Sequence, residues 1–149
     1  MRTWRNLYSL LKAADVDRRH CFFTNAYVGL VAGQKAVGRF PGADSPQFVA
    51  WCRDFLLYQI AVMRPSALIT LGADARRFVG ELSTDLGAWR ARRADPIVNR
   101  ARIEGHQLVA VALAHPSMYP VSAASRRFDG QRGMAAEVAL LRAAGRSVS

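Results

Sequence analysis

The sequence is poor in cysteine, in acidic residues and in long apolar runs. Its 149 residues include two cysteines and 11 Asp and Glu. Cys21 and Cys52 cannot build a disulfide framework or supply four thiolates to a metal. No stretch approaches the ~20 apolar residues that span a bilayer, and the first residues lack the apolar run of a secretory signal. We therefore expect a reduced cytoplasmic protein without a membrane segment.

The composition favours one folded, basic domain over residues 1–149. Hydrophobic residues make up 51% and charged residues 21%, which is enough apolar material for a core. The net charge is +10, and all basic residues except Lys12 and Lys35 are Arg. A GC-rich coding sequence would produce the same Arg bias. An excess of positive charge on a small domain nevertheless favours a polyanionic partner.

Apolar residues at helical spacing predict helices over roughly 3–14, 46–63, 73–86 and 132–144. Thr3 is expected to cap the first helix. Ser45-Pro46 gives the second a hydroxyl cap and a proline in its first turn. Gly145 is expected to follow the last helix as its C′ residue.

Short apolar runs predict buried strands at 21–24, 67–71 and 107–113. The turn at 104–106 leads into the third strand, and the basic stretch 88–102 is expected to be an irregular loop. Strands that alternate with helices and are apolar on both faces indicate a three-layer α/β/α fold with a short parallel sheet. Ligands of such folds bind beyond the carboxyl ends of the strands.

Two polar side chains directly follow predicted strands. Asn25 comes after the first strand and His115 comes after the third. An Asn amide both donates and accepts, which suits the edge of a heterocycle, and an imidazole can donate to an oxygen that gains charge. Taken alone, Asn25 could be a turn residue and His115 a satisfied loop histidine. Their matching positions at strand ends favour a site.

Three blocks of the sequence, in order, resemble the uracil-DNA glycosylase superfamily. The first, Phe22-Phe23-Thr24-Asn25, is similar to a strand-end motif whose Asn reads the edge of uracil. The second runs from Cys52 through Arg64-Pro65 to Leu71-Gly72, and is similar to the family's helix, Arg-Pro corner and strand ending in Leu-Gly. The third, His115-Pro116-Ser117, is similar to the family's DNA-side loop. The ordered set is more specific than any of its tripeptides.

The resemblance implies a DNA repair glycosylase that reads a flipped uracil or a related deaminated base, without metal or cofactor. Asn25 and Ser117 would then bind the base, and His115 would stabilise the negative charge that builds on it as it departs. Tyr119 takes the position of the wedge that probes the gap in the duplex, and Met118 is the other candidate for that role.

The same resemblance places Arg126 and Arg127 close behind the His-Pro-Ser loop, where they could hold DNA phosphates. A solvated surface is the alternative for this pair. The iron–sulfur branches of the superfamily need four cysteines. Here Gly29 stands where those branches place one of them, and only Cys52 fits the pattern. We therefore expect no cluster, and we expect a monomer.

The family's acid-bearing motif lies on a first, central strand upstream of the helix that corresponds to 3–14. No Asp or Glu precedes Asp15 in this chain. The resemblance thus implies a domain that lacks its first strand, through a misplaced start, truncation or decay, unless the remaining strands pair directly. Catalytic activity is in doubt for the same reason. The alternative to an enzyme is a non-catalytic DNA- or base-binding module of the same fold. An unrelated α/β domain that binds a nucleotide or a protein is the third possibility.

Overall fold

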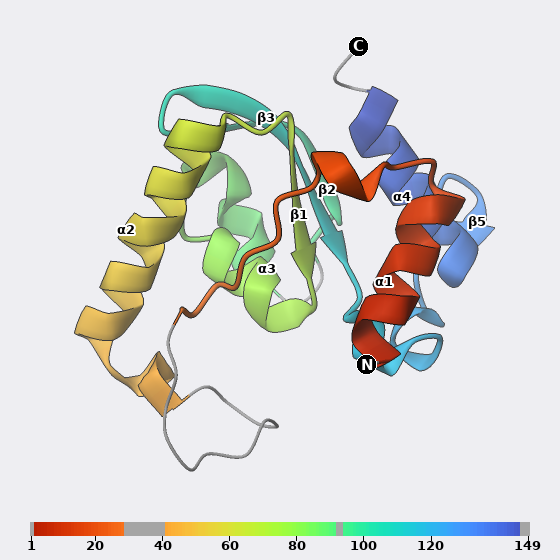
Figure 1. The fold of residues 1–149 in the computed structure, drawn as a ribbon, viewed down its shortest axis with the longest axis horizontal. Coiled ribbons are helices and arrows are strands. Elements are labelled where there is room, and N and C mark those ends of the chain that lie inside the picture. The colour runs from red at the N-terminus through yellow and green to blue at the C-terminus, as the bar shows by residue number, and fades with distance from the viewer. Residues whose placement is uncertain (1, 29–40, 92–93, 147–149) are drawn as a thin grey trace.

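A three-stranded sheet forms the centre of the fold in the computed structural model, which describes residues 2–28, 41–91 and 94–146 (Figure 1). The strands are β1 (Ala67–Leu71), β2 (Ile97–Ile103) and β3 (His106–Leu113), in the order β1-β3-β2. β1 runs parallel to β3, with Ala67 opposite Val109, whereas β2 is antiparallel to β3. β3 is therefore the central strand, with hydrogen-bonded neighbours on both sides.

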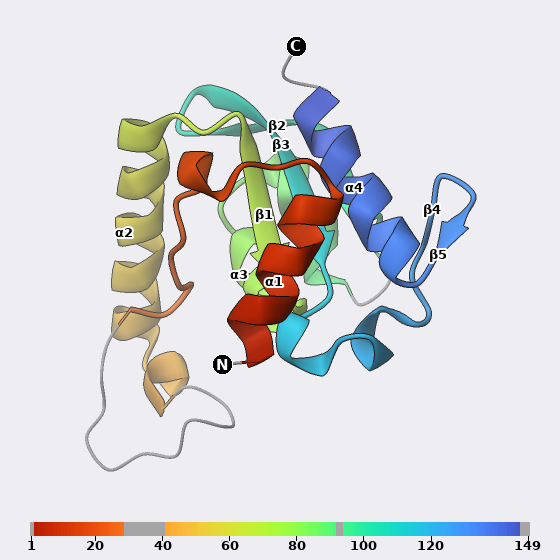
Figure 2. The ribbon, with the colours of Figure 1, turned by 45° about the vertical axis from the view of Figure 1, so that its right-hand side comes forward.

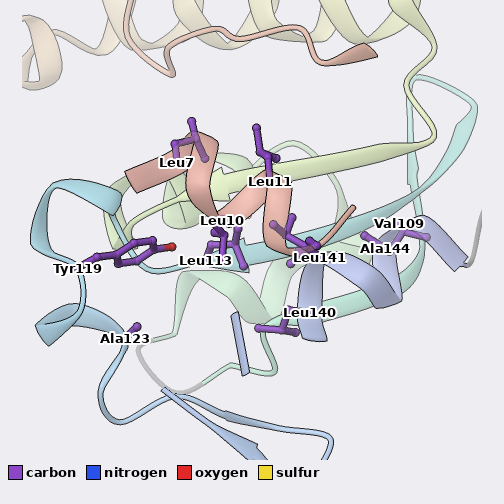
Figure 3. Close-up of a cluster of buried hydrophobic side chains, with 12 residues drawn as sticks. Leu7, Leu10, Leu11, Val109, Leu113, Tyr119, Ala123, Leu140, Leu141 and Ala144 are labelled. Carbon is purple, nitrogen blue, oxygen red and sulfur yellow. The ribbon is translucent and has the colours of Figure 1, made fainter. Parts of the chain in front are cut away.

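Helices cover both faces of this sheet (Figure 2). One face packs against α1 (Arg2–Ala13) and α4 (Met134–Arg146), and the other packs against α2 (Pro46–Met63) and α3 (Ala73–Val79). Successive residues of β3 point to opposite faces, so Val109, Val111 and Leu113 join the first core while Leu108, Ala110 and Ala112 join the second. Figure 3 shows the first core, where Leu10 and Leu141 meet Leu113. The expected three layers are confirmed.

The sheet is mixed, so the prediction of a parallel sheet is wrong in one strand. The stretch expected to be an irregular loop contains β2, which a two-residue turn joins to β3. Both turn residues have positive φ, 49° at Glu104 and 71° at Gly105, as a type I′ turn requires. Turns of this type connect antiparallel neighbours. Ala101 and Ile103 are buried and alternate with the exposed Arg100 and Arg102. Because of these charged positions, the sequence of the strand resembles that of a loop.

The strand predicted at 21–24 does not form. This segment is extended but unpaired, and Phe22 and Phe23 are 57% and 40% exposed. In both ribbon views it runs beside β1 on the side of α2 (Figures 1 and 2). No backbone hydrogen bond joins 21–28 to β1 among the described residues. A β-prone sequence becomes a strand only when a neighbour pairs with it, and β1 is accordingly an edge strand.

The predicted helices form, with changes at their ends. Ser45 Oγ accepts from the Phe48 N–H at 3.3 Å, which confirms the cap of α2. The third helix stops at Val79 and is followed by a separate 3₁₀ helix, Thr84–Arg90. α4 continues to Arg146, so Gly145 lies inside it and not after it. Within the described ranges, no helix is both long and apolar enough to cross a bilayer.

The remaining elements are short. They are the 3₁₀ helices Arg18–His20, Pro41–Asp44, Pro116–Met118 and Val121–Ala123, and the strands β4 (Arg127–Phe128) and β5 (Gln131–Arg132), which pair antiparallel.

Substitution of Gly105 tests the turn that makes the sheet mixed. A Cβ at this position would meet nothing within 4 Å, so the effect of Gly105→Ala is purely conformational. We expect it to lower the free energy of unfolding by about 1–2 kcal/mol, the cost of a left-handed L-residue. Gly87→Ala is the matched control, because Gly87 has no positive φ and its added Cβ would make only an ordinary contact. Equal urea midpoints for the two variants would contradict the turn assignment.

Candidate functional site

His115 lies directly beyond the carboxyl end of β3, against the end of β1. The Gly72 N–H donates to the Leu113 carbonyl at 2.9 Å, which ties the two strand ends together. Gly72 has φ +92°, and a Cβ on it would lie 3.2 Å from His115 Cβ and 3.4 Å from Cδ2. Only glycine adopts this backbone conformation readily. Gly72 thus allows the imidazole to pack over the end of the neighbouring strand.

The contacts of the His115 ring determine where its proton sits. Nδ1 lies 3.2 Å from the Ser117 backbone nitrogen and 2.7 Å from Ser117 Oγ. A backbone N–H can only donate, so Nδ1 is the acceptor and the neutral ring carries its hydrogen on Nε2. His115 is exposed, so this N–H is available to a ligand at the strand ends. The site therefore presents a fixed hydrogen-bond donor.

A buried carboxylate holds the segment that carries His115. Glu137, on α4, is 0% exposed and accepts three hydrogen bonds. The donors are the Ala114 backbone N–H at 2.9 Å, the Tyr119 hydroxyl at 3.0 Å and Arg126 Nε at 2.7 Å. These bonds compensate the loss of solvation that burial of a carboxylate entails. They also fix both ends of the segment 114–119 to α4.

Tyr119 and Arg126, both predicted to contact DNA, are bound to this buried carboxylate. Tyr119 is 5% exposed, and burial together with the Glu137 charge raises the pKa of its hydroxyl. The charge of Arg126 is balanced by Glu137, and its Nη2 donates to the Ala112 carbonyl at 3.2 Å. Met118, the other candidate for the wedge, is 59% exposed.

The remaining predicted site residues lie on separate segments. Asn25 is exposed on the extended segment beside β1, and Arg127 is exposed on β4. Two contacts anchor the Asn25 segment: Thr24 Oγ1 lies 3.2 Å from Gln59 Oε1 of α2, and Tyr27 packs edge-on against Phe78 of α3. The structure brings His115 and Ser117 into contact, but no contact within the described residues joins Asn25 to His115.

Two residues that position the site were missed in the sequence. Asn6 of α1 donates through Nδ2 to the Pro116 carbonyl at 2.7 Å, which holds the His-Pro-Ser loop from the other side. Glu137 is the other. Glu137 did carry a signal, since it stands three and four positions before Leu140 and Leu141, on the buried face of α4. A carboxylate on a core face must have partners.

The described residues include no group of three or more His, Cys, Asp or Glu that could hold a metal ion. Cys52 lies on the buried face of α2. Cys21 is half-buried, and burial raises the pKa of its thiol.

The energetic role of the Tyr119 hydroxyl can be measured directly. We expect Tyr119→Phe to lower the free energy of unfolding by about 2 kcal/mol, since it removes a buried hydrogen bond to a charged acceptor. Tyr58→Phe is the matched control, because Tyr58 is 65% exposed and should change stability by less than about 0.5 kcal/mol. Urea unfolding followed by tryptophan fluorescence measures both. Equal effects of the two substitutions would argue against the Glu137 network.

Comparison with known proteins identifies the family to which the chain belongs. No curated protein matches the chain at a significant level. A family model described as the uracil DNA glycosylase superfamily matches residues 3–133, which include the segment of Asn25, the Gly72 turn and the His-Pro-Ser loop. Of the described helices and strands, α4 is the one that lies wholly outside the match. Because the match covers most of its length, the chain belongs to the uracil DNA glycosylase superfamily.

Proposed function

We propose that the chain recognises uracil, or a related deaminated base, that has flipped out of DNA. The observation that carries this proposal is the pair of contacts from Ser117 to His115 Nδ1, which assigns the ring hydrogen to Nε2 at the strand ends. A base must leave the duplex to reach such a group, at a cost of a few kcal/mol for unstacking.

Asn25 is the proposed reader of the base. Uracil presents an N–H between two carbonyl oxygens, so one amide can accept from the N–H and donate to a carbonyl. Cytosine presents the opposite donor and acceptor pattern. A buried polar group left unpaired costs about 1–3 kcal/mol, which sets the scale of the discrimination. The exposed position of Asn25 leaves its amide accessible to a base.

His115 is the proposed catalytic residue. Cleavage of the glycosidic bond leaves an oxocarbenium-like sugar and places negative charge on the departing base. The Nε2–H of His115 would donate to the base carbonyl that gains this charge. A preorganised donor of this kind contributes about 10²- to 10³-fold to rate. Ser117 orients the imidazole through its contact with Nδ1. Met118, the next residue, is exposed and is the proposed side chain that enters the gap in the duplex.

A specific observation keeps the non-catalytic module as the second candidate. Hydrolysis requires a water molecule to attack the sugar, and a carboxylate is the usual activating group. Glu137 is fully buried and bonded to three donors. Asp74, two residues after Gly72, is paired with Arg77 on the same helix. Both carboxylates are therefore already engaged with other groups.

Uracil release from a single-uracil oligonucleotide tests the proposal. We expect His115→Ala to reduce release by at least about 10²-fold, because it removes the donor to the leaving base. His20→Ala is the matched control, since His20 is exposed on the short helix Arg18–His20 and should leave the rate unchanged.

Asn25→Asp separates base reading from catalysis. The carboxylate cannot donate to a uracil carbonyl, so the variant should lose its preference for uracil over cytosine in binding. Binding that depends on uracil and Asn25, without release of the base, would identify the non-catalytic module. The absence of both release and uracil-dependent binding, with cooperative unfolding retained, would refute the proposal.

A further inference from the structure

Three aromatic side chains form an exposed cluster on α1 and the segment that carries Asn25. Trp4 and Tyr8 come from α1, and Phe23 comes from the extended segment, with exposed fractions of 41%, 36% and 40%. Trp4 packs edge-on against Phe23 with ring centroids 5.3 Å apart, and it lies 5.6 Å from Tyr8. We name these three residues the aromatic platform. Clustered exposed aromatics of this kind mark binding surfaces in soluble proteins.

The platform is separate from the core-facing side of α1. Leu7, Leu10 and Leu11 fill the core, and the Trp4–Tyr8 row runs along the adjoining side of the helix. Lys12 continues this row by one more turn, since residues four apart share a face. Along this adjoining side of α1, the rings of Trp4 and Tyr8 are therefore followed by a basic residue.

Basic residues surround the platform. Residues 2–28 contain Arg2, Arg5, Lys12, Arg18 and Arg19 against Asp15 and Asp17, which gives a local excess of three positive charges. The Arg18 guanidinium lies over the Tyr8 ring, 4.9 Å from its centroid. Asp17 is paired with Arg19, so that acidic charge is already matched locally. Arg5, Lys12 and Arg18 are exposed.

We propose that the aromatic platform binds single-stranded DNA. Exposed rings offer stacking surfaces to unpaired bases, and interleaved cations follow the phosphates, which is the chemistry of single-strand binding. In a duplex the base faces are covered by their neighbours, so the rings would have nothing to stack on. Lys12, on the same side of α1 as the platform, argues against a protein partner, because lysine is depleted from protein interfaces.

The position of the platform connects it to the candidate site. Phe23 precedes Asn25 by two residues, and Asn6 of the same helix holds the Pro116 carbonyl. A strand that crosses the platform is therefore led toward Asn25 and the His-Pro-Ser loop. The inference rests on the proposed function for its choice of DNA as the polyanion, and it adds the single strand as the form of DNA that is bound.

A second exposed aromatic row provides an internal control. Trp51 stacks on Phe55 of α2 with an interplanar angle of 1°, and Trp51 is 54% exposed. The one basic residue within this row, Arg53, is followed directly by Asp54. The two surfaces thus offer comparable rings in different electrostatic settings.

Binding of a labelled oligodeoxycytidine of about 12 nucleotides, a length within the usual single-strand site sizes, tests the proposal by fluorescence anisotropy. Cytosine is the base that Asn25 is proposed to reject, so the result does not depend on base reading. We expect Trp4→Ala and Phe23→Ala each to weaken binding about 10-fold, in line with the loss of one stacked base. Trp51→Ala should leave the affinity unchanged. Phe23 is 40% exposed on an unpaired segment, so its substitution should not unfold the chain.

Two further measurements decide the chemistry. Arg18→Gln should reduce the salt dependence by about one phosphate contact, and a duplex of the same length should bind more weakly than the single strand. Equal losses from Trp51→Ala, or tighter binding of the duplex, would overturn the proposal. Concentration-dependent self-association that Trp4→Ala abolishes, with oligodeoxycytidine affinity unaffected, would identify a protein-docking surface and also overturn it.

The same experiments distinguish failure of this inference from failure of the proposed function. A His115→Ala variant that loses uracil release and still binds oligodeoxycytidine leaves the platform intact. A wild-type chain that releases uracil but does not bind the single strand refutes the platform alone.

Discussion

The buried carboxylate of Glu137 is the interaction on which the candidate site depends. An ionised group at 0% exposure is tolerated only when donors surround it, and Glu137 has the Ala114 N–H, the Tyr119 hydroxyl and Arg126. Those donors lie at the end of the central strand and on the segments that follow it. One side chain of α4 therefore anchors the end of β3 and the segment that carries His115. The family match stops before α4, so this support comes from the part of the chain that the match does not cover.

This arrangement divides the positive charge of the protein into two groups. Arg126 serves the interior, where its charge is balanced by Glu137. Other cations remain exposed: Arg5, Lys12 and Arg18 lie on and after α1 with the aromatic platform, and Arg127 lies on β4. The net charge of +10 therefore indicates a polyanionic partner only through the exposed cations, which can bind it. The place of Arg126 in the sequence predicts a contact with DNA, but it does not reveal the ion pair of Arg126 with the buried Glu137.

Much of the fold follows from local signals. The Ser45-Pro46 cap, the apolar run of β3 and the helical spacing of α1 are properties of neighbouring residues, and each predicted its element correctly. The failures involve partners distant in sequence. The segment 21–24 has strand propensity but no neighbour to pair with, and β2 is stabilised by its hairpin despite its arginines. Likewise His115 could be singled out from its place after a strand. The tautomer that makes it a donor depends on contacts with Ser117, and its support comes from Glu137.

Amide hydrogen exchange of Ala114 tests the central claim most directly, because the Ala114 N–H donates to Glu137 itself. Ala110, buried in the middle of β3, reports the stability of the sheet. In Glu137→Leu, which keeps the volume and removes the acceptor, protection at Ala114 should fall much further than protection at Ala110. That result would show that the carboxylate holds the segment carrying His115. An equal loss at both amides, or protection at Ala114 that is unchanged, would contradict the account.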